Sequence, residues 1–122
     1  MRRLLASFRY AFAGIFHTVR TQPNARIHLG VIVLVVALGL WLGLSLVEWA
    51  VIVLTSAVVF MAEMFNTAIE ATIDLATRDH HPLAKIGKDV AAGAVLVGAI
   101  LAVLIGVLLL GPRLWARLAG WW

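Results

Sequence analysis

The sequence contains no cysteine among its 122 residues, so neither a disulfide nor a thiol nucleophile contributes to its stability or chemistry. Charge is also scarce, since only 13% of the residues are charged whereas 63% are hydrophobic, and the mean hydropathy is +1.02. This composition predicts an integral membrane protein with a single domain over residues 1–122. The net charge of +4 does not suggest nucleic acid, and no nucleic-acid partner is expected.

The nucleotide-binding signatures of soluble enzymes are missing as well. Gly87-Lys88 is followed by Asp89 rather than by Ser or Thr, and Pro82 occupies the position where a P-loop needs glycine. The protein-kinase signatures are absent too. Any phosphate chemistry must therefore use a different arrangement of residues.

Three apolar segments approach the ~20 residues that a bilayer core requires, which predicts an all-α fold with three transmembrane spans. They cover residues 29–46, 47–64 and 90–110. The second helix is predicted to continue beyond its span, as a projecting stalk, to Ala76 or Thr77. Gly111-Pro112 is expected to end the third helix.

Two further segments are expected to lie at the membrane surface. Residues 3–20 have a basic, amphipathic pattern, which predicts a helix in the membrane interface that ends before Pro23. Residues 78–88 form a polar break, predicted to be an exposed loop followed by the start of the third helix. The N-terminal segment and this loop carry eight of the ten basic residues. Both are therefore predicted to be cytoplasmic, and the turn between the first two spans is predicted to lie outside.

Four polar residues recur on one face of the second helix and its extension. Glu63, Asn66, Glu70 and Asp74 fall at offsets 0, 3, 7 and 11, hence within about 80° of one another on a helix. Ionisable groups near bilayer depth cost roughly 2.5–3.5 kcal/mol on insertion scales and usually mark a functional interior. An ordinary solvated face is the alternative, but such a face would normally mix Lys or Arg with the acids.

The chemistry available to this polar stripe includes phosphoryl transfer. That reaction needs carboxylates to hold Mg²⁺, a cation on the phosphates and a base for the attacking hydroxyl, and Lys88-Asp89 adds the cation. A cation or proton pathway uses the same inventory, so a small oligomeric transporter remains an alternative at this point. It would need acidic residues at mid-membrane in the third span, but residues 29–46 and 90–110 contain no ionisable side chain.

Several other polar residues have ordinary explanations. Asp74 and Arg78 are spaced to form an i,i+4 ion pair. His80 and His81 are adjacent and lack helical ligand spacing, so we expect solvated loop residues rather than a metal site. His28 is expected to be an interfacial polar residue.

Five sequence elements resemble one known family. They are SFRYA (7–11), NARIH (24–28), EMFNTAIEATID (63–74), HPLAK (81–85) and KDVAAGAV (88–95). Together they look like the prokaryotic diacylglycerol kinase family over nearly the whole chain, with residues 63–74 as the most specific motif. The last element is similar to the undecaprenol kinase branch, because the diacylglycerol-specific branch typically has Ser where this chain has Ala92.

The resemblance implies a homotrimeric lipid kinase of the bacterial inner membrane. It implies that MgATP is the phosphoryl donor, that Mg²⁺ is the cofactor, and that sites are shared between neighbouring chains. The acceptor is the hydroxyl of a membrane lipid alcohol. Undecaprenol is the expected substrate, and diacylglycerol, which would yield phosphatidic acid, is the alternative.

The resemblance also assigns residue roles. Glu63 matches the catalytic base, and Glu70 matches a metal-binding carboxylate. The expected nucleotide contacts are Arg3, Tyr10, Glu70, Asp79, His80, His81, Lys88 and Asp89. The expected substrate contacts are Glu63, Asn66, Asn24, Arg26, His28 and Ala92.

One position departs from the family pattern. Gln22 stands where the family usually has a Glu that helps to hold the metal, and a neutral amide is a weaker ligand for a hard cation. Either Glu70 and the ATP phosphates suffice, or the affinity for metal is reduced. Gln22 as a solvated residue before a proline is an equally good reading.

Overall fold

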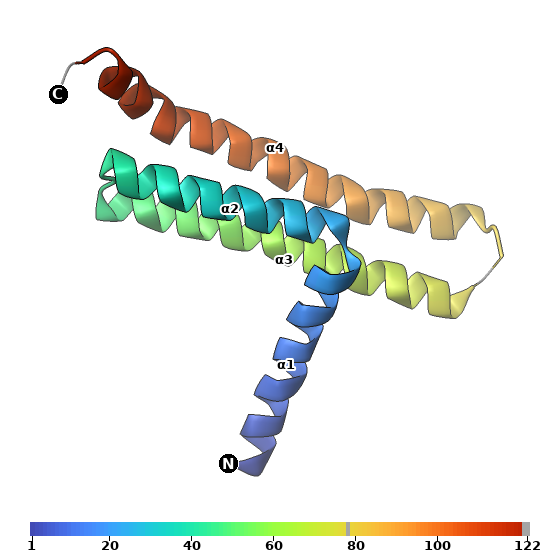
Figure 1. Cartoon of the computed structure of the whole chain (residues 1–122). Helices are drawn as coiled ribbons and strands as arrows, with labels where there is room; N and C mark the ends of the chain where they lie inside the picture. Colours follow the sequence, from blue (N-terminus) through green and yellow to red (C-terminus); the bar gives the residue numbers. More distant parts are fainter. Residues whose placement is uncertain (78, 121–122) are drawn as a thin grey trace.

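The computed structural model describes residues 1–77 and 79–120, and within them the chain forms four helices. They are α1 (Arg2–Thr21), α2 (Pro23–Leu42), α3 (Leu46–Ala76) and α4 (Pro82–Leu118). α2, α3 and α4 lie alongside one another, and α3 and α4 form the most extensive contact (Figure 1). The predicted all-α fold is confirmed.

In the described part of the chain, three helices are long and apolar enough to cross a membrane, namely α2, α3 and α4. At 1.5 Å per residue, the 31 residues of α3 and the 37 of α4 extend about 46 and 55 Å, whereas a bilayer core is about 30 Å thick. Parts of both helices therefore extend beyond the hydrocarbon region. α3 continues without interruption to Ala76, as the sequence predicted.

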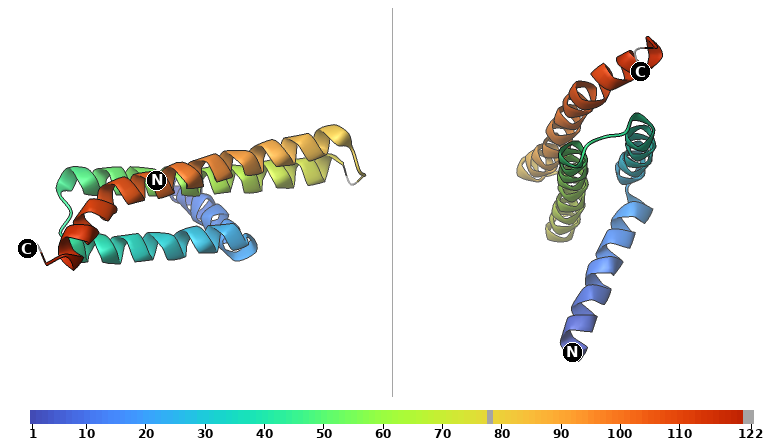
Figure 2. Two further views of the ribbon diagram at one scale, coloured as in Figure 1. Left: turned by 90° about the horizontal axis from the view of Figure 1, so that it is seen from above. Right: turned by 90° about the vertical axis from the view of Figure 1, so that its left-hand side faces the viewer.

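α1 projects from the bundle, and its end and the start of α2 lie beside the middle of α3 (Figures 1 and 2). Gln22 separates α1 from α2 because its backbone is extended, with φ −101° and ψ 114°, and Pro23 then opens α2. Large apolar side chains of α1 remain exposed, among them Leu4, Leu5, Phe8, Phe12 and Phe16. The predicted helix is present, and its position in the membrane interface stays a prediction.

The first predicted span, 29–46, runs past the end of its helix. α2 ends at Leu42 because Gly43 adopts a left-handed conformation with φ 66°. Gly39 permits close packing just before this turn, since a Cβ there would lie 2.8 Å from the Trp49 ring. The turn therefore begins earlier than the apolar pattern indicated, because two glycines rather than polar residues shape it.

A second prediction, that Gly111-Pro112 ends the third helix, is wrong. α4 continues through Pro112 to Leu118. A proline in a helix removes one backbone hydrogen bond, but the following turns are held by long-range contacts. Arg113 donates to both carboxylate oxygens of Glu48, at 2.9 and 2.7 Å, and Arg117 lies over the Trp41 ring at 5.6 Å.

The Arg113–Glu48 pair joins the end of α4 to the start of α3. Glu48 also accepts a hydrogen bond from the backbone N–H of Ser45, at 2.7 Å, as part of a capping box. Both side chains of the ion pair are partly buried, with 28% of Arg113 and 19% of Glu48 exposed. We therefore expect it to matter for stability more than a surface ion pair does.

Replacing Arg113 by Gln is expected to lower the midpoint of thermal unfolding in detergent by several degrees, because the carboxylate of Glu48 loses its cationic partner and keeps only the hydrogen bonds from Ser45. The double variant with Glu48→Gln should recover part of the loss. Lys85→Gln is the matched control, since it breaks an ion pair in which 78% and 60% of the side chains are exposed. An equal shift in Arg113→Gln and Lys85→Gln would contradict a specific role for the partly buried Arg113–Glu48 pair.

Candidate active site

The polar stripe of α3 changes from buried to exposed along the helix. Glu63 is 0% exposed and Asn66 is 6% exposed, whereas Glu70 is half-buried and Asp74 is exposed. Asn66 donates a hydrogen bond to Oε1 of Glu70 at 3.2 Å. The stripe thus forms a continuous polar path from the protein interior to the end of α3 that faces the loop.

Glu63 is the largest fully buried side chain among the described residues. Neither of its carboxylate oxygens has a hydrogen-bond partner in the described part of the chain, and the same holds for Oδ1 of Asn66. His28 on α2 and Glu70 are close enough to interact with it electrostatically. Burying a carboxylate without a partner lowers the stability of the fold. The presence of Glu63 at this position therefore points to a catalytic or binding role.

The junction of α1 and α2 lies beside the middle of α3, the part of that helix that contains Glu63 (Figure 1). Thr18 and Ala25, on either side of the junction, are 3% and 0% exposed, and both helices contact α3. Thr67, also buried, donates from Oγ1 to the backbone oxygen of Glu63 at 2.8 Å. The α1–α2 junction therefore covers the middle of α3 where the catalytic base is expected.

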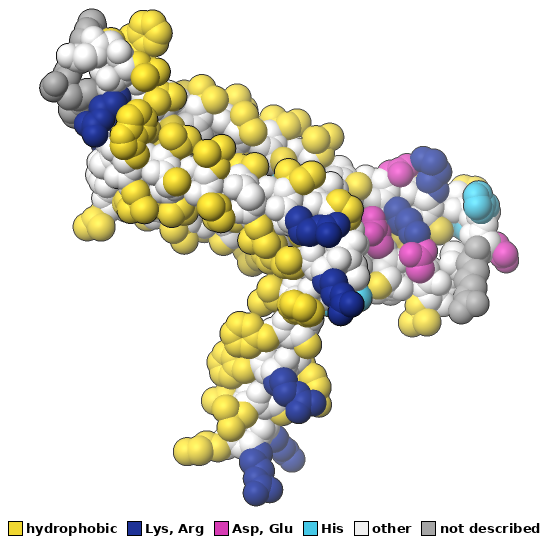
Figure 3. Space-filling model, in the orientation of Figure 1, with side chains coloured by type: hydrophobic (Ala, Val, Ile, Leu, Met, Phe, Trp, Pro, Cys, Tyr) yellow, Lys and Arg dark blue, Asp and Glu magenta, His cyan; other side chains and the backbone are white. Residues whose placement is uncertain are grey.

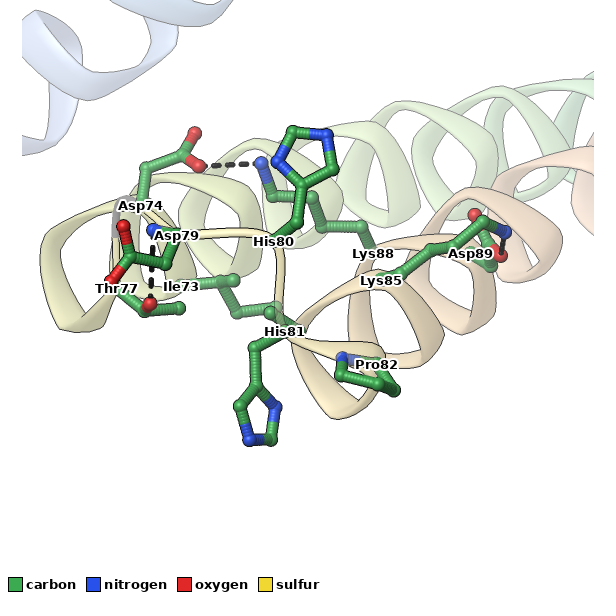
Figure 4. A pocket seen from close by; sticks show the side chains of 11 residues that line it. Ile73, Asp74, Thr77, Asp79, His80, His81, Pro82, Lys85, Lys88 and Asp89 are labelled. Carbon is green, nitrogen blue, oxygen red and sulfur yellow. Dashed lines mark hydrogen bonds and ion pairs between the residues drawn. The ribbon is translucent and has the colours of Figure 1, made fainter.

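A pocket of about 970 Å³ lies at the other end of the stripe, between the end of α3 and the start of α4 (Figure 4). His81 caps α4 by accepting a hydrogen bond from the N–H of Leu83 through Nδ1, at 3.2 Å, and Pro82 opens the helix. Acidic, basic and histidine side chains gather at this end of the molecule, whereas the bundle itself is apolar (Figure 3). The lining residues are Ile73, Asp74, Thr77, Asp79, His80, His81, Pro82, Ala84, Lys85, Lys88 and Asp89.

The described residues form two ion pairs in this pocket. Nζ of Lys88 on α4 pairs with Oδ1 of Asp74 on α3, and Lys85 pairs with Asp89 within α4 (Figure 4). The predicted partner of Asp74 was Arg78, which lies outside the described residues. The Asp74–Lys88 pair therefore adds a contact between α3 and α4 that the sequence did not suggest.

The structure places five of the eight expected nucleotide contacts in the pocket: Asp79, His80, His81, Lys88 and Asp89. Glu70 does not line it, but lies one helical turn from Asp74 along the stripe. Arg3 and Tyr10 are exposed on α1, which points away from the pocket (Figure 1). One chain alone therefore does not bring these two residues to the others.

The expected substrate contacts also divide into groups. Glu63 and Asn66 form the buried end of the stripe. His28 is half-buried on α2 and lines an apolar groove of about 560 Å³ bounded by α2, α3 and α4. Asn24 and Arg26 are exposed in the first turn of α2. Ala92 is likewise exposed; it is one turn beyond Lys88 on α4 and lines neither pocket.

The expected metal ligands lie on different elements. Gln22 is half-buried between α1 and α2, and Glu70 is half-buried on α3. The described residues contain no group of three or more histidine or acidic side chains arranged to hold a metal ion. Mg²⁺ is commonly bound by one or two carboxylates together with substrate phosphates, so the half-buried carboxylate of Glu70 fits this cation.

Asp74 and Lys85 line the pocket although the sequence did not assign them to a site. The spacing of Asp74 with the other acids of the stripe was a usable signal, but an i,i+4 pair with Arg78 explained it equally well. Its contact with Lys88 depends on how the antiparallel helices α3 and α4 align about the loop. That alignment is a tertiary property which helical periodicity does not define.

A carboxylate stripe leads to a lysine-containing pocket, and both are carried by helices of membrane length. These are the side chains that phosphoryl transfer at a membrane requires. The chain belongs to the prokaryotic diacylglycerol kinase family, whose sequence model matches residues 9–110. It is thus a lipid kinase and a bacterial membrane protein, as the sequence predicted.

Characterised relatives extend this result. The chain is 44% identical to the undecaprenol kinase of Bacillus subtilis (strain 168) over 114 residues, which cover 93% of each chain. It is 48% identical to the diacylglycerol kinase of a Synechocystis species over 91% of this chain and 64% of the relative. It is 26% identical to the diacylglycerol kinase of Escherichia coli (strain K12) over 88% of each chain.

Proposed function

We propose that this protein transfers the γ-phosphoryl group of MgATP to the hydroxyl group of undecaprenol. The observation that carries the proposal is the buried carboxylate of Glu63, which has no hydrogen-bond partner among the described residues. It lies at one end of a polar stripe whose other end reaches the pocket of Lys88. Asp74, in that pocket, is 11 residues from Glu63, or about 16 Å along α3. An ATP molecule extended along the stripe can span this distance, with its γ-phosphate toward Glu63.

In this mechanism Glu63 accepts the proton of the lipid hydroxyl as its oxygen attacks the γ-phosphorus, and the bond to the leaving ADP oxygen breaks. The buried environment of Glu63 keeps water from competing as the acceptor. Lys88 neutralises phosphate charge from α4, and Asn66, bonded to Glu70, fixes the geometry between base and phosphates.

Magnesium, when bound, supplies charge neutralisation on the transferring phosphates. Glu70 is the proposed protein ligand, and Gln22 is the second, weaker candidate because its amide carries no charge. The half-buried position of Glu70 between the base and the pocket supports this assignment.

The membrane arrangement follows the same proposal. α1 lies in the cytoplasmic interface, which its projection from the bundle and its exposed apolar side chains support (Figure 1). The loop between α3 and α4 lies in the cytoplasm, where ATP is available. The protein acts as a homotrimer, and Arg3 and Tyr10 of one chain reach the nucleotide of a neighbour, since they do not reach the pocket within their own chain.

Substrate choice rests on the Bacillus subtilis relative and on Ala92. A Ser at this position could donate a hydrogen bond to the ester end of diacylglycerol, whereas Ala offers an apolar wall that undecaprenol, with its single hydroxyl, tolerates. Diacylglycerol remains the second candidate because the Synechocystis relative is a diacylglycerol kinase.

Wild-type protein is expected to have a higher kcat/KM for undecaprenol than for diacylglycerol at matched mole fractions in mixed micelles. Ala92→Ser should raise the relative kcat/KM for diacylglycerol about three- to tenfold, which corresponds to roughly 0.5–1.5 kcal/mol for one hydrogen bond. Ala94→Ser, two residues further on the exposed side of α4, is the matched control and should leave the ratio unchanged. A wild-type preference for diacylglycerol would contradict the substrate assignment but not the lipid-kinase activity.

A further inference from the structure

Asp74 is the one acid of the stripe to which the proposed mechanism gives no role. It lies on the last turns of α3, and its Oδ1 accepts from Nζ of Lys88 across the pocket (Figure 4). The Lys88 side chain is 37% exposed and that of Asp74 is 64% exposed, so water and ligands reach both. The contact joins different helices, 14 positions apart in the sequence.

The pair restrains a side chain that is otherwise flexible. A free lysine has four rotatable bonds, and fixing them on a ligand opposes binding or reaction through lost entropy. An ammonium group has three donors, and Asp74 accepts from one, so the others remain available to phosphate oxygens. Lys88 can therefore be held over the pocket and bind a phosphate at the same time.

A carboxylate beside bound phosphates also has an opposing effect. Its negative charge repels the nucleotide, so it weakens ground-state binding while it orients the lysine. These two effects have separable kinetic signatures, because a residue that only binds nucleotide changes KM, whereas one that orients a group needed in the transition state changes kcat.

We propose that Asp74 is a positioning residue for phosphoryl transfer: it holds Lys88 across the α3–α4 pocket so that the ammonium meets the phosphates of the bound nucleotide. The proposal rests on the proposed function of this site. It assigns Asp74 a role through Lys88 rather than through direct contact with substrate.

The test compares Asp74→Asn and Asp74→Glu with the wild type, by following transfer of labelled phosphate to undecaprenol at varied MgATP. Asp74→Asn is expected to lower kcat about three- to tenfold, with the KM for ATP unchanged within about twofold or lowered. Asp74→Glu, which keeps the charge, should restore at least half of the lost kcat. Thr72→Ala, an exposed position on the same helix outside the pocket, is the matched control and should behave as wild type.

A double-mutant cycle shows whether Asp74 acts through Lys88. In a Lys88→Gln background, Asp74→Asn should lower kcat by no more than about a further twofold. If the double variant instead shows the product of the two single losses in kcat, the proposal is contradicted. A rise in the KM for ATP at constant kcat, or kinetics unchanged from wild type, would overturn it as well. If the wild type itself transfers no phosphate, the proposed function fails; if the wild type is active and Asp74→Asn is unaffected, only the role of Asp74 fails.

Discussion

Replacing Glu63 by Gln is expected to abolish phosphoryl transfer and leave the fold intact. The amide has the shape of the carboxylate but cannot accept the proton of the lipid hydroxyl, and loss of a general base lowers rates by about a hundredfold or more. In the described part of the chain the carboxylate oxygens of Glu63 form no hydrogen bond, so the substitution breaks none. It removes a buried carboxylate and should therefore leave the midpoint of thermal unfolding equal to that of wild type or higher.

This combination of lost activity and retained stability separates a catalytic role from a structural one. Thr67→Val is a useful comparison, because Thr67 is also buried but donates to the backbone oxygen of Glu63. It is expected to lower stability while retaining measurable turnover. If Glu63→Gln retains more than about 1% of wild-type kcat, Glu63 is not the base.

The second large effect concerns the metal requirement. Glu70→Ala should raise the Mg²⁺ concentration for half-maximal activity by on the order of tenfold or more, because the remaining candidate ligand, Gln22, is uncharged. Gln22→Glu should lower that concentration, since it adds a second carboxylate. Titrating activity against Mg²⁺ at saturating ATP measures both changes.

Asn66 provides a control for the Glu70 experiment, because it donates to Glu70 and loss of Glu70 also breaks that contact. Asn66→Ala removes the same hydrogen bond but leaves the carboxylate, and should shift the Mg²⁺ requirement much less than Glu70→Ala does. An unchanged Mg²⁺ dependence in both Glu70→Ala and Gln22→Glu would contradict the assignment of these residues to the metal.

Local chemistry made much of the fold predictable. The break at Gln22-Pro23 and the helical register of the stripe from Glu63 to Asp74 follow from proline geometry and the helical repeat, and both agree with the structure. The extension of α4 beyond Pro112 did not follow, because a proline signal is local whereas the contact of Arg113 with Glu48 spans 65 positions.

The site shows the same division between local and tertiary information. Helical spacing grouped Glu63, Asn66, Glu70 and Asp74, but it did not reveal that Glu63 would be buried beneath the α1–α2 junction or that Asp74 would face Lys88. Both features depend on packing between helices. The contribution of Arg3 and Tyr10 depends on contacts between chains and remains a prediction.

The most direct test of the central proposal is to incubate purified protein with ATP labelled in its γ-phosphate, Mg²⁺ and mixed micelles that contain undecaprenol. The predicted result is label in undecaprenyl phosphate from the wild type, and none above background from Glu63→Gln or from micelles without a lipid alcohol. Absence of labelled lipid with wild-type protein, for undecaprenol and diacylglycerol alike, would contradict the proposed function.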